Sequence, residues 1–111
     1  MNIYDTANRL AYEIKKSEEY VNYKNIKTEV QNNPELKEKL EKFEKSRYEI
    51  QLASIQGEKQ DNQRAIEIQN LYAELIKNET MKTYFDAEFK FNVLLTDINK
   101  IIGEAVEDLI K

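Results

Sequence analysis

The chain has 111 residues, a length that suits one domain. Of these residues 41% are hydrophobic and 34% are charged, and this high charged fraction is typical of long, exposed helices. Two glycines and one proline are too few for the turns of an all-β or α/β chain, and the absence of cysteine and histidine removes disulfides, thiol nucleophiles and the commonest metal ligands. A net charge of −4 disfavours direct binding of nucleic acid, which usually requires a basic surface.

The first 31 residues predict two helices. Apolar residues recur at helical spacing over residues 3–16, and Ser17 followed by two glutamates is a typical helix start. The second helix then runs to about Gln31, with Tyr20 and Tyr23 on its inner side. A single helix bent near Ser17 is the alternative.

The third helix begins at Asn33-Pro34-Glu35, which combines an N-cap, a proline suited to the first turn and an acid at the positive end of the helix dipole. It runs to about Gln56, and Gly57 ends it as a left-handed residue. Its alternating Glu and Lys residues predict a solvated face.

The apolar residues of this third helix form two stripes about 120–130° apart. The first consists of Leu36, Leu40, Phe43 and Ile50, and the second of Tyr48, Leu52 and Ile55. Two stripes predict burial on two sides, either deeper in the chain's own core or against another molecule.

A polar connection with Asp61 as an N-cap leads to a fourth helix that ends near Lys77. After a break at Asn78, the fifth helix is expected over residues 79–109, with a heptad spacing that favours near-antiparallel packing and is broken at Glu88. Gly103 interrupts it, and either the close approach of another helix or a fraying end explains a glycine there.

The fifth helix is the basis for a predicted homodimer. At 1.5 Å per residue it would extend roughly 46 Å, whereas a compact domain of this size has a diameter of about 34 Å. We therefore expect a second copy to complete its apolar stripe, in a homodimer or a higher homo-oligomer. The resulting prediction is an all-α fold of about five helices, one domain over residues 1–111, with antiparallel packing completed by dimerisation.

No pattern of catalytic chemistry is evident. There is no glycine-rich phosphate loop, the three serines have no neighbouring base, and the acids lie among lysines or on polar faces. We therefore expect no enzyme, no catalytic residue, no metal site and no cofactor. The N-terminus lacks the features of a signal peptide and no apolar run is long enough to cross a membrane, so we expect a cytoplasmic protein.

The order and spacing of several short segments resemble the small bacterial YlbF/YmcA-like proteins, especially their YheA-type branch. These segments span nearly the whole chain: Ile3-Tyr4-Asp5, Ser17-Glu18-Glu19-Tyr20, Tyr23-Lys24, Phe43, Gln56-Gly57-Glu58 and Asn99-Lys100-Ile101-Ile102. The resemblance implies an all-helical dimer or higher oligomer without enzymatic activity. It also implies a regulatory role, since relatives influence competence, sporulation, biofilm formation and RNA processing. The iron–sulfur clusters of some relatives are held by cysteines, which this chain lacks.

The leading hypothesis is a non-enzymatic adaptor that binds another protein, and the alternative is a self-assembling structural protein. Neither direct nucleic-acid binding nor membrane binding is expected. Seven residues are the candidate interface: Tyr48, Leu52, Ile55, Phe91, Leu95, Ile98 and Ile102.

Overall fold

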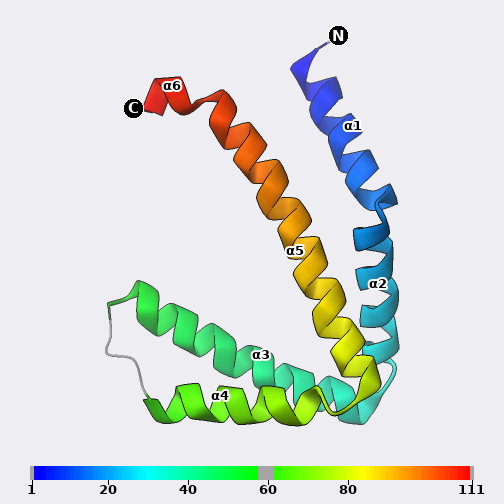
Figure 1. Cartoon of the computed structure of the whole chain (residues 1–111), viewed down its shortest axis with the longest axis vertical. Coiled ribbons are helices and arrows are strands. Elements are labelled where there is room, and N and C mark those ends of the chain that lie inside the picture. The colour runs from blue at the N-terminus through cyan, green and yellow to red at the C-terminus, as the bar shows by residue number, and fades with distance from the viewer. Residues whose placement is uncertain (1, 58–61, 111) are drawn as a thin grey trace. The chain divides into compact units, whose positions relative to one another are not determined.

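The computed structural model describes residues 2–57 and 62–110, and within these ranges it contains six helices and no strand. The all-α prediction is therefore confirmed. The helices are α1 (Ile3–Lys16), α2 (Glu18–Gln31), α3 (Pro34–Ile55), α4 (Asn62–Leu75), α5 (Glu79–Ala105) and α6 (Glu107–Ile110), as labelled in Figure 1.

The chain divides into two compact units. The first combines residues 1–26 with residues 84–111, and therefore contains α1, most of α2, most of α5 and α6. The second is the continuous stretch from residue 27 to residue 83, which contains α3 and α4. The prediction of a single domain stays a prediction.

Two polar caps determine where α2 and α3 begin. The Ser17 backbone is extended, with φ −63° and ψ 147°, so α1 and α2 are separate helices. The Ser17 hydroxyl accepts a hydrogen bond from the Tyr20 backbone N–H at 3.1 Å and donates one to the Ile14 carbonyl at 2.6 Å. Asn33 caps α3 in the same way by accepting from the Leu36 N–H at 3.2 Å. Both starts match the sequence prediction, because a cap is a local interaction.

In the second unit, α3 and α4 lie side by side and run in opposite directions (Figure 1). The first apolar stripe of α3 is the side that is covered, since Leu36, Leu40 and Phe43 are buried. The Phe43 ring lies 6.0 Å from the Tyr72 ring of α4. Beside this pair, the Lys39 ammonium lies 3.7 Å from the Glu74 carboxylate. The core of this unit is therefore a helical hairpin bordered by an ion pair.

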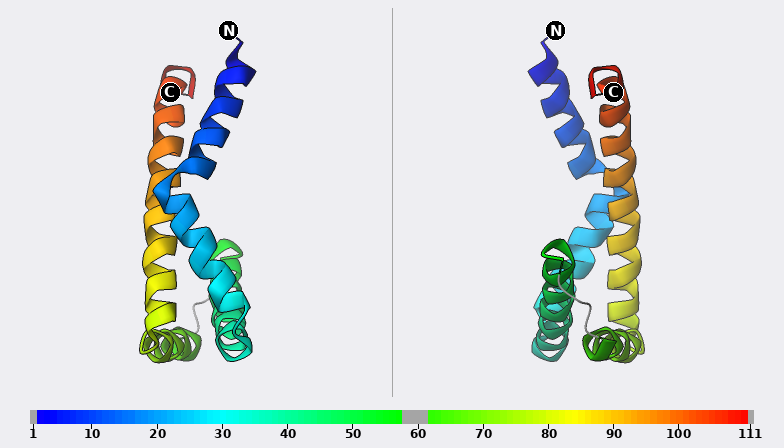
Figure 2. Two further views of the ribbon diagram at one scale, coloured as in Figure 1. Left: turned by 90° about the vertical axis from the view of Figure 1, so that its right-hand side faces the viewer. Right: turned by 90° about the vertical axis from the view of Figure 1, so that its left-hand side faces the viewer.

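In the first unit, aromatic side chains join α2 to the N-terminal half of α5. α2 lies beside this half of α5 in Figure 1 and crosses α5 at an angle in Figure 2. The Tyr23 ring lies 5.6 Å from Tyr84 and 5.7 Å from Phe91, and Tyr20 lies 6.0 Å from Phe91. Such tilted or edge-to-face pairs stabilise a contact beyond the area that they bury. The aromatic residues of α2 are thus the packing surface of this unit.

The prediction of one helix over residues 79–109 is wrong at its C-terminal end. α5 ends at Ala105, Val106 lies in a turn, and the short helix α6 was not predicted. The Val106 N–H bonds to the carbonyl of Gly103, three residues back, so the helix tightens there. Glycine weakens a helix, and the acids Glu107 and Asp108 favour a new helix start. The last break therefore comes just after Gly103.

Two further boundaries were set by turns. Gly57 follows α3 with φ +73°, the left-handed conformation that was predicted. α4 ends at Leu75, two residues before the predicted Lys77. The Lys77 N–H then donates a hydrogen bond to the backbone carbonyl of Glu74 at 3.3 Å, again three residues back. The predicted cap at Asp61 lies outside the described residues.

Candidate protein interaction surfaces

The second apolar stripe of α3, formed by Tyr48, Leu52 and Ile55, is exposed. We call it the α3 stripe. Their exposed fractions are 62%, 40% and 83%, whereas the first stripe is packed toward α4. The alternative that this half of α3 lies deeper in the chain's own core is therefore wrong. An uncovered stripe at i, i+4, i+7 spacing is a surface on which another helix packs well.

Three charged side chains that flank the α3 stripe, Glu44, Arg47 and Glu49, are paired within the chain. Glu44 forms an ion pair with Arg47, whose guanidinium also lies 5.2 Å from the Phe43 ring. On the other side of the helix, Glu49 lies 3.7 Å from Arg64 of α4. The stripe is therefore apolar at its centre and polar at its edges, which is the usual composition of a protein–protein contact.

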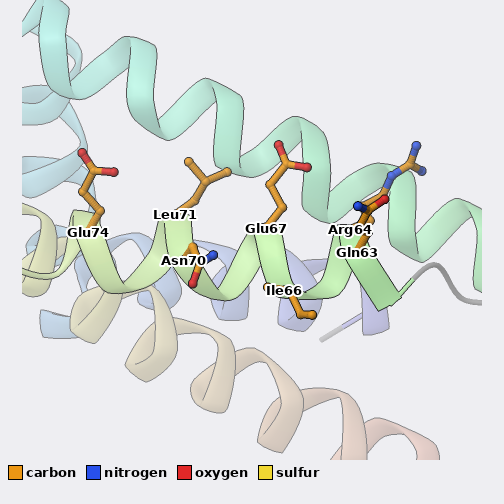
Figure 3. A pocket seen from close by; sticks show the side chains of 7 residues that line it. All are labelled: Gln63, Arg64, Ile66, Glu67, Asn70, Leu71 and Glu74. Atoms are coloured by element: carbon orange, nitrogen blue, oxygen red, sulfur yellow. The ribbon is translucent and has the colours of Figure 1, made fainter.

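An open hollow of about 500 Å³ lies along α4 (Figure 3). In the figure Glu67, Leu71 and Glu74 point toward α3, whereas Ile66 points away from it. Two of its lining residues already hold charged partners on α3, since Arg64 pairs with Glu49 and Glu74 pairs with Lys39. Ligand pockets are usually enclosed and mostly apolar, so this hollow is a polar groove on the surface. Its lining is Gln63, Arg64, Ile66, Glu67, Asn70, Leu71 and Glu74.

The four candidate residues of α5 differ in their surroundings. Phe91 packs against Tyr20 and Tyr23 in its own unit and is half-buried. Leu95 and Ile98 are also half-buried, whereas Ile102 is exposed. Exposure along this face thus increases toward the C-terminal end of α5.

Sequence reasoning missed an apolar surface on α1. It recognised Ile3, Ala7, Leu10 and Ile14 as one helical stripe but did not include them among the interface candidates. None of the α1 residues is buried, and Ile3 is 78% exposed. The i, i+4, i+7, i+11 spacing that singled out Phe91, Leu95, Ile98 and Ile102 was equally present in this stripe.

The electrostatic environment of Lys39 differs from that of an isolated lysine. A hydrogen bond to Glu35 and the charge of Glu35, with a further contribution from Glu74, raise the pKa of Lys39 above its ordinary value of 10.5. The Lys39–Glu35 distance is 3.2 Å. This cation thus connects neighbouring turns of α3 with α4 and stabilises the hairpin, without features of a catalytic group.

The described residues were also searched for a metal site and for a membrane-spanning helix. Among residues 2–57 and 62–110, no group of three or more acidic side chains is placed to hold a metal ion. No helix within the same ranges has both the length and the apolar character required to span a bilayer.

Comparison with known proteins places the chain in a family. The profile of the family described as "Control of competence regulator ComK, YlbF/YmcA" matches residues 3–107. The chain belongs to the YlbF/YmcA family. The match includes α1 through α5, so family membership rests on nearly the entire sequence.

One relative and two solved structures are similar to this chain. A UPF0342 protein of Halothermothrix orenii is 36% identical over 107 residues, covering 96% of this chain and 91% of the relative. The solved structure of a Bacillus stearothermophilus "Protein of Unknown Function (DUF964)" has a TM-score of 0.84 at 15% identity, covering 98% of this chain and 96% of that one. Bacillus subtilis RicA, solved in complex with RicF, has a TM-score of 0.61 at 22% identity with the same coverage. At these identities the two structures show that the YlbF/YmcA chain shares their fold.

Proposed function

We propose that this chain is a non-enzymatic regulatory adaptor of the cytoplasm, which acts by binding another protein and works as a homodimer or higher homo-oligomer. The observation that carries the proposal is the α3 stripe, whose three apolar residues are exposed, whereas Leu36, Leu40 and Phe43 on the other apolar stripe of α3 are buried. The family description, which concerns control of a competence regulator, supports a regulatory role. The solved complex of RicA with RicF supports protein binding as the mode of action, because RicA has the same fold.

The process that this adaptor serves is one of those implied for its relatives: competence, sporulation, biofilm formation or RNA processing. The absence of histidine and cysteine supports a non-catalytic role, because these side chains carry much of enzyme acid–base and nucleophilic chemistry. The net charge of −4 supports a protein partner rather than a nucleic acid. No cofactor is part of the proposal.

The partner of the α3 stripe is expected to present an apolar helix face. Tyr48, Leu52 and Ile55 lie on successive turns, so their contacts repeat at the spacing of a facing helix. Tyrosine at one end adds a large ring and a hydroxyl that remains near solvent, a combination that is common in the centre of protein contacts.

Affinity purification from the native host, followed by mass spectrometry and measurement of binding with the purified partner, tests this function. Tyr48→Glu and the double change Tyr48→Glu with Leu52→Glu should each abolish binding and leave helicity unchanged. Ile66→Glu is the matched control, because Ile66 is 57% exposed and lies on α4 of the same unit. Full binding by the Tyr48→Glu, Leu52→Glu chain would rule out the α3 stripe. A chain that assembles beyond a dimer and retains no other protein would favour the self-assembling structural protein instead.

A further inference from the structure

The α3 stripe lies in the part of α3 that carries the least charge. Residues 34–47 contain nine charged residues, whereas residues 48–57 contain one, Glu49. Glu49 already lies 3.7 Å from Arg64 of α4. The exposed polar residues of the same stretch are uncharged: Gln51, Ser54 and Gln56. From Tyr48 to the end of α3, the rim of the stripe is therefore polar but neutral.

A neutral rim limits the charge that a partner can place against it. A charged side chain opposite this rim would lose hydration without gaining an ion pair, which is unfavourable. A partner with amides or hydroxyls beside its apolar residues avoids this loss, and its amides can exchange hydrogen bonds with those of Gln51 and Gln56. The rim therefore favours an uncharged contact face over a basic or an acidic one.

The size of the α3 stripe suits a single helix. From Tyr48 to Ile55 it extends about 10 Å, or two helical turns. Burial of its three side chains removes roughly 300 Å² from water, at about 100 Å² each, which is well below the ~800 Å² per partner of a standard interface. α4 covers the other side of this part of α3, where Ile50 and Ala53 are half-buried (Figure 1). The free face thus offers room for one helix and too little area for a stable contact between whole domains.

The two ends of the stripe differ in electrostatic potential. Beyond Ile55, α3 ends without a basic residue in its last turn, so its carbonyl end keeps a negative partial charge. One turn before Tyr48, the exposed Lys45 carries a positive charge. A helix is positive at its N-terminus and negative at its C-terminus. An antiparallel helix therefore meets an opposite charge at both ends of the stripe, whereas a parallel one meets a like charge at both.

We propose that the partner contributes one helix, which lies antiparallel to α3 on the α3 stripe and whose apolar residues are flanked by uncharged polar ones. This assignment rests on the adaptor function proposed above and names the chemistry of the partner. The apolar residues of that helix repeat at i, i+4 and i+7 and meet Tyr48, Leu52 and Ile55 on successive turns. Because the buried area is small, the contact is transient.

The first test uses three synthetic helical peptides of about 18 residues, or five turns. All have leucine at i, i+4, i+7 and i+11 and the same mixed charges on the far face, and the positions beside the leucines are all Gln, all Lys or all Glu. Fluorescence anisotropy measures their binding to the full chain. The Gln peptide should bind at least about tenfold more tightly than either charged peptide, and its affinity should hardly change with salt. Equal binding of the three, or tighter binding of a charged peptide, would overturn the proposal.

Variants of the chain locate the contact. Leu52→Glu should abolish binding of the Gln peptide, and Ile66→Glu is the matched control, because Ile66 is also exposed and lies on α4 of the same unit. Gln51→Glu should weaken the Gln peptide and strengthen the Lys peptide, since a new ion pair then forms at the rim. This gain cannot result from misfolding. Unchanged binding to Leu52→Glu, or no change of preference in Gln51→Glu, counts against the α3 stripe as the site.

The direction of the helix is tested by cross-linking, because the chain has no cysteine of its own. Gln56→Cys places one thiol at the C-terminal end of α3. It is mixed under oxidising conditions with Gln peptides that carry a single cysteine at the N-terminal or at the C-terminal end. The N-terminal cysteine should form the disulfide on the order of tenfold faster, because binding holds it near this end of the stripe. Equal rates, or faster reaction of the C-terminal cysteine, would contradict the antiparallel arrangement.

Failure of this inference differs from failure of the adaptor function. If the Gln peptide binds the α3 stripe but no host protein is retained by the chain, the adaptor function is wrong and the binding chemistry of the stripe stands. If a host protein binds through Tyr48 and Leu52 but the three peptides bind equally, the adaptor function stands and the neutral antiparallel helix is wrong.

Discussion

The Tyr23 hydroxyl of α2 donates a hydrogen bond to the Glu88 carboxylate of α5 at 3.3 Å. Glu88 is the residue that breaks the apolar heptad of α5, and it is half-buried beside the aromatic contacts of Tyr23. The hydrogen bond gives the Glu88 carboxylate a polar partner on the face of α5 that packs against α2. It links two residues that lie 65 positions apart in the sequence.

Tyr23→Phe removes this donor and should lower the free energy of unfolding by about 1–3 kcal/mol, because a half-buried carboxylate then loses a hydrogen bond. Urea unfolding followed by circular dichroism measures the loss. Glu88→Leu should be neutral or stabilising, because it restores the heptad. In the double variant Tyr23→Phe should then cost less than it does alone, and equal costs in both backgrounds would show that the two side chains are not coupled.

Met81→Ala should be among the most destabilising single changes. Met81 is fully buried at the start of α5, and loss of its side chain leaves a cavity that costs roughly 2–5 kcal/mol. The neighbouring Lys82 is exposed, so Lys82→Ala should change stability by less than about 0.5 kcal/mol. Thermal and urea unfolding of both variants give the comparison. Equal losses would contradict the burial of Met81.

Ser17→Ala should cost about 1 kcal/mol, because the serine hydroxyl caps α2 and also bonds back to Ile14. Ser17→Asp keeps the acceptor at the helix start and should recover much of that loss. The unfolding midpoints of the three proteins, measured in urea, check this order. An unchanged midpoint for Ser17→Ala would mean that the cap contributes nothing.

The contribution of Lys39 to the free energy of unfolding should depend on pH in the alkaline range. Its pKa is higher in the folded chain than the ordinary 10.5, chiefly through the hydrogen bond to Glu35. A lysine whose pKa is raised by folding stabilises the folded state fully at pH values below its pKa in the unfolded chain. That stabilisation is lost as the pH rises through its pKa in the folded chain. The stability difference between wild type and Lys39→Gln, measured by urea unfolding, should therefore be constant near neutral pH and shrink above about pH 10.5. Lys37→Gln, a change at an exposed position of the same helix, is the control.

Gly103→Ala should stabilise the chain by about 0.5–1 kcal/mol, because a β-carbon at this position meets nothing within 4 Å and alanine is the better helix former. Gly103 lies away from the Ile98–Ile102 face of α5, so the dimer mass should not change. Thermal unfolding and light scattering check the two parts. A loss of dimer in Gly103→Ala would instead place a neighbouring helix against this glycine, as one sequence interpretation held.

The parts of the fold that sequence reasoning predicted correctly are local. The starts of α2 and α3 follow from the N-caps Ser17 and Asn33, which bond to residues within three positions. The end of α3 follows from Gly57, whose left-handed conformation is also a local property. The end of α5 was missed because the apolar heptad continues through Ala105 and Leu109. Periodicity reports which face is apolar, and it does not report where the backbone tightens.

The amino-acid sequence by itself determined the helical class, the positions of the caps and the presence of two apolar stripes on α3, because each depends on propensity, spacing and short-range hydrogen bonds. The tertiary structure decided which stripe is core. Leu40 and Phe43 pack in the α3–α4 hairpin while Ile55 is exposed, although all three are apolar at helical spacing. Burial of a stripe depends on which other helix faces it, and that relation joins residues far apart in the chain. The exposure of α1 and of the C-terminal end of α5 was likewise decided by the tertiary structure.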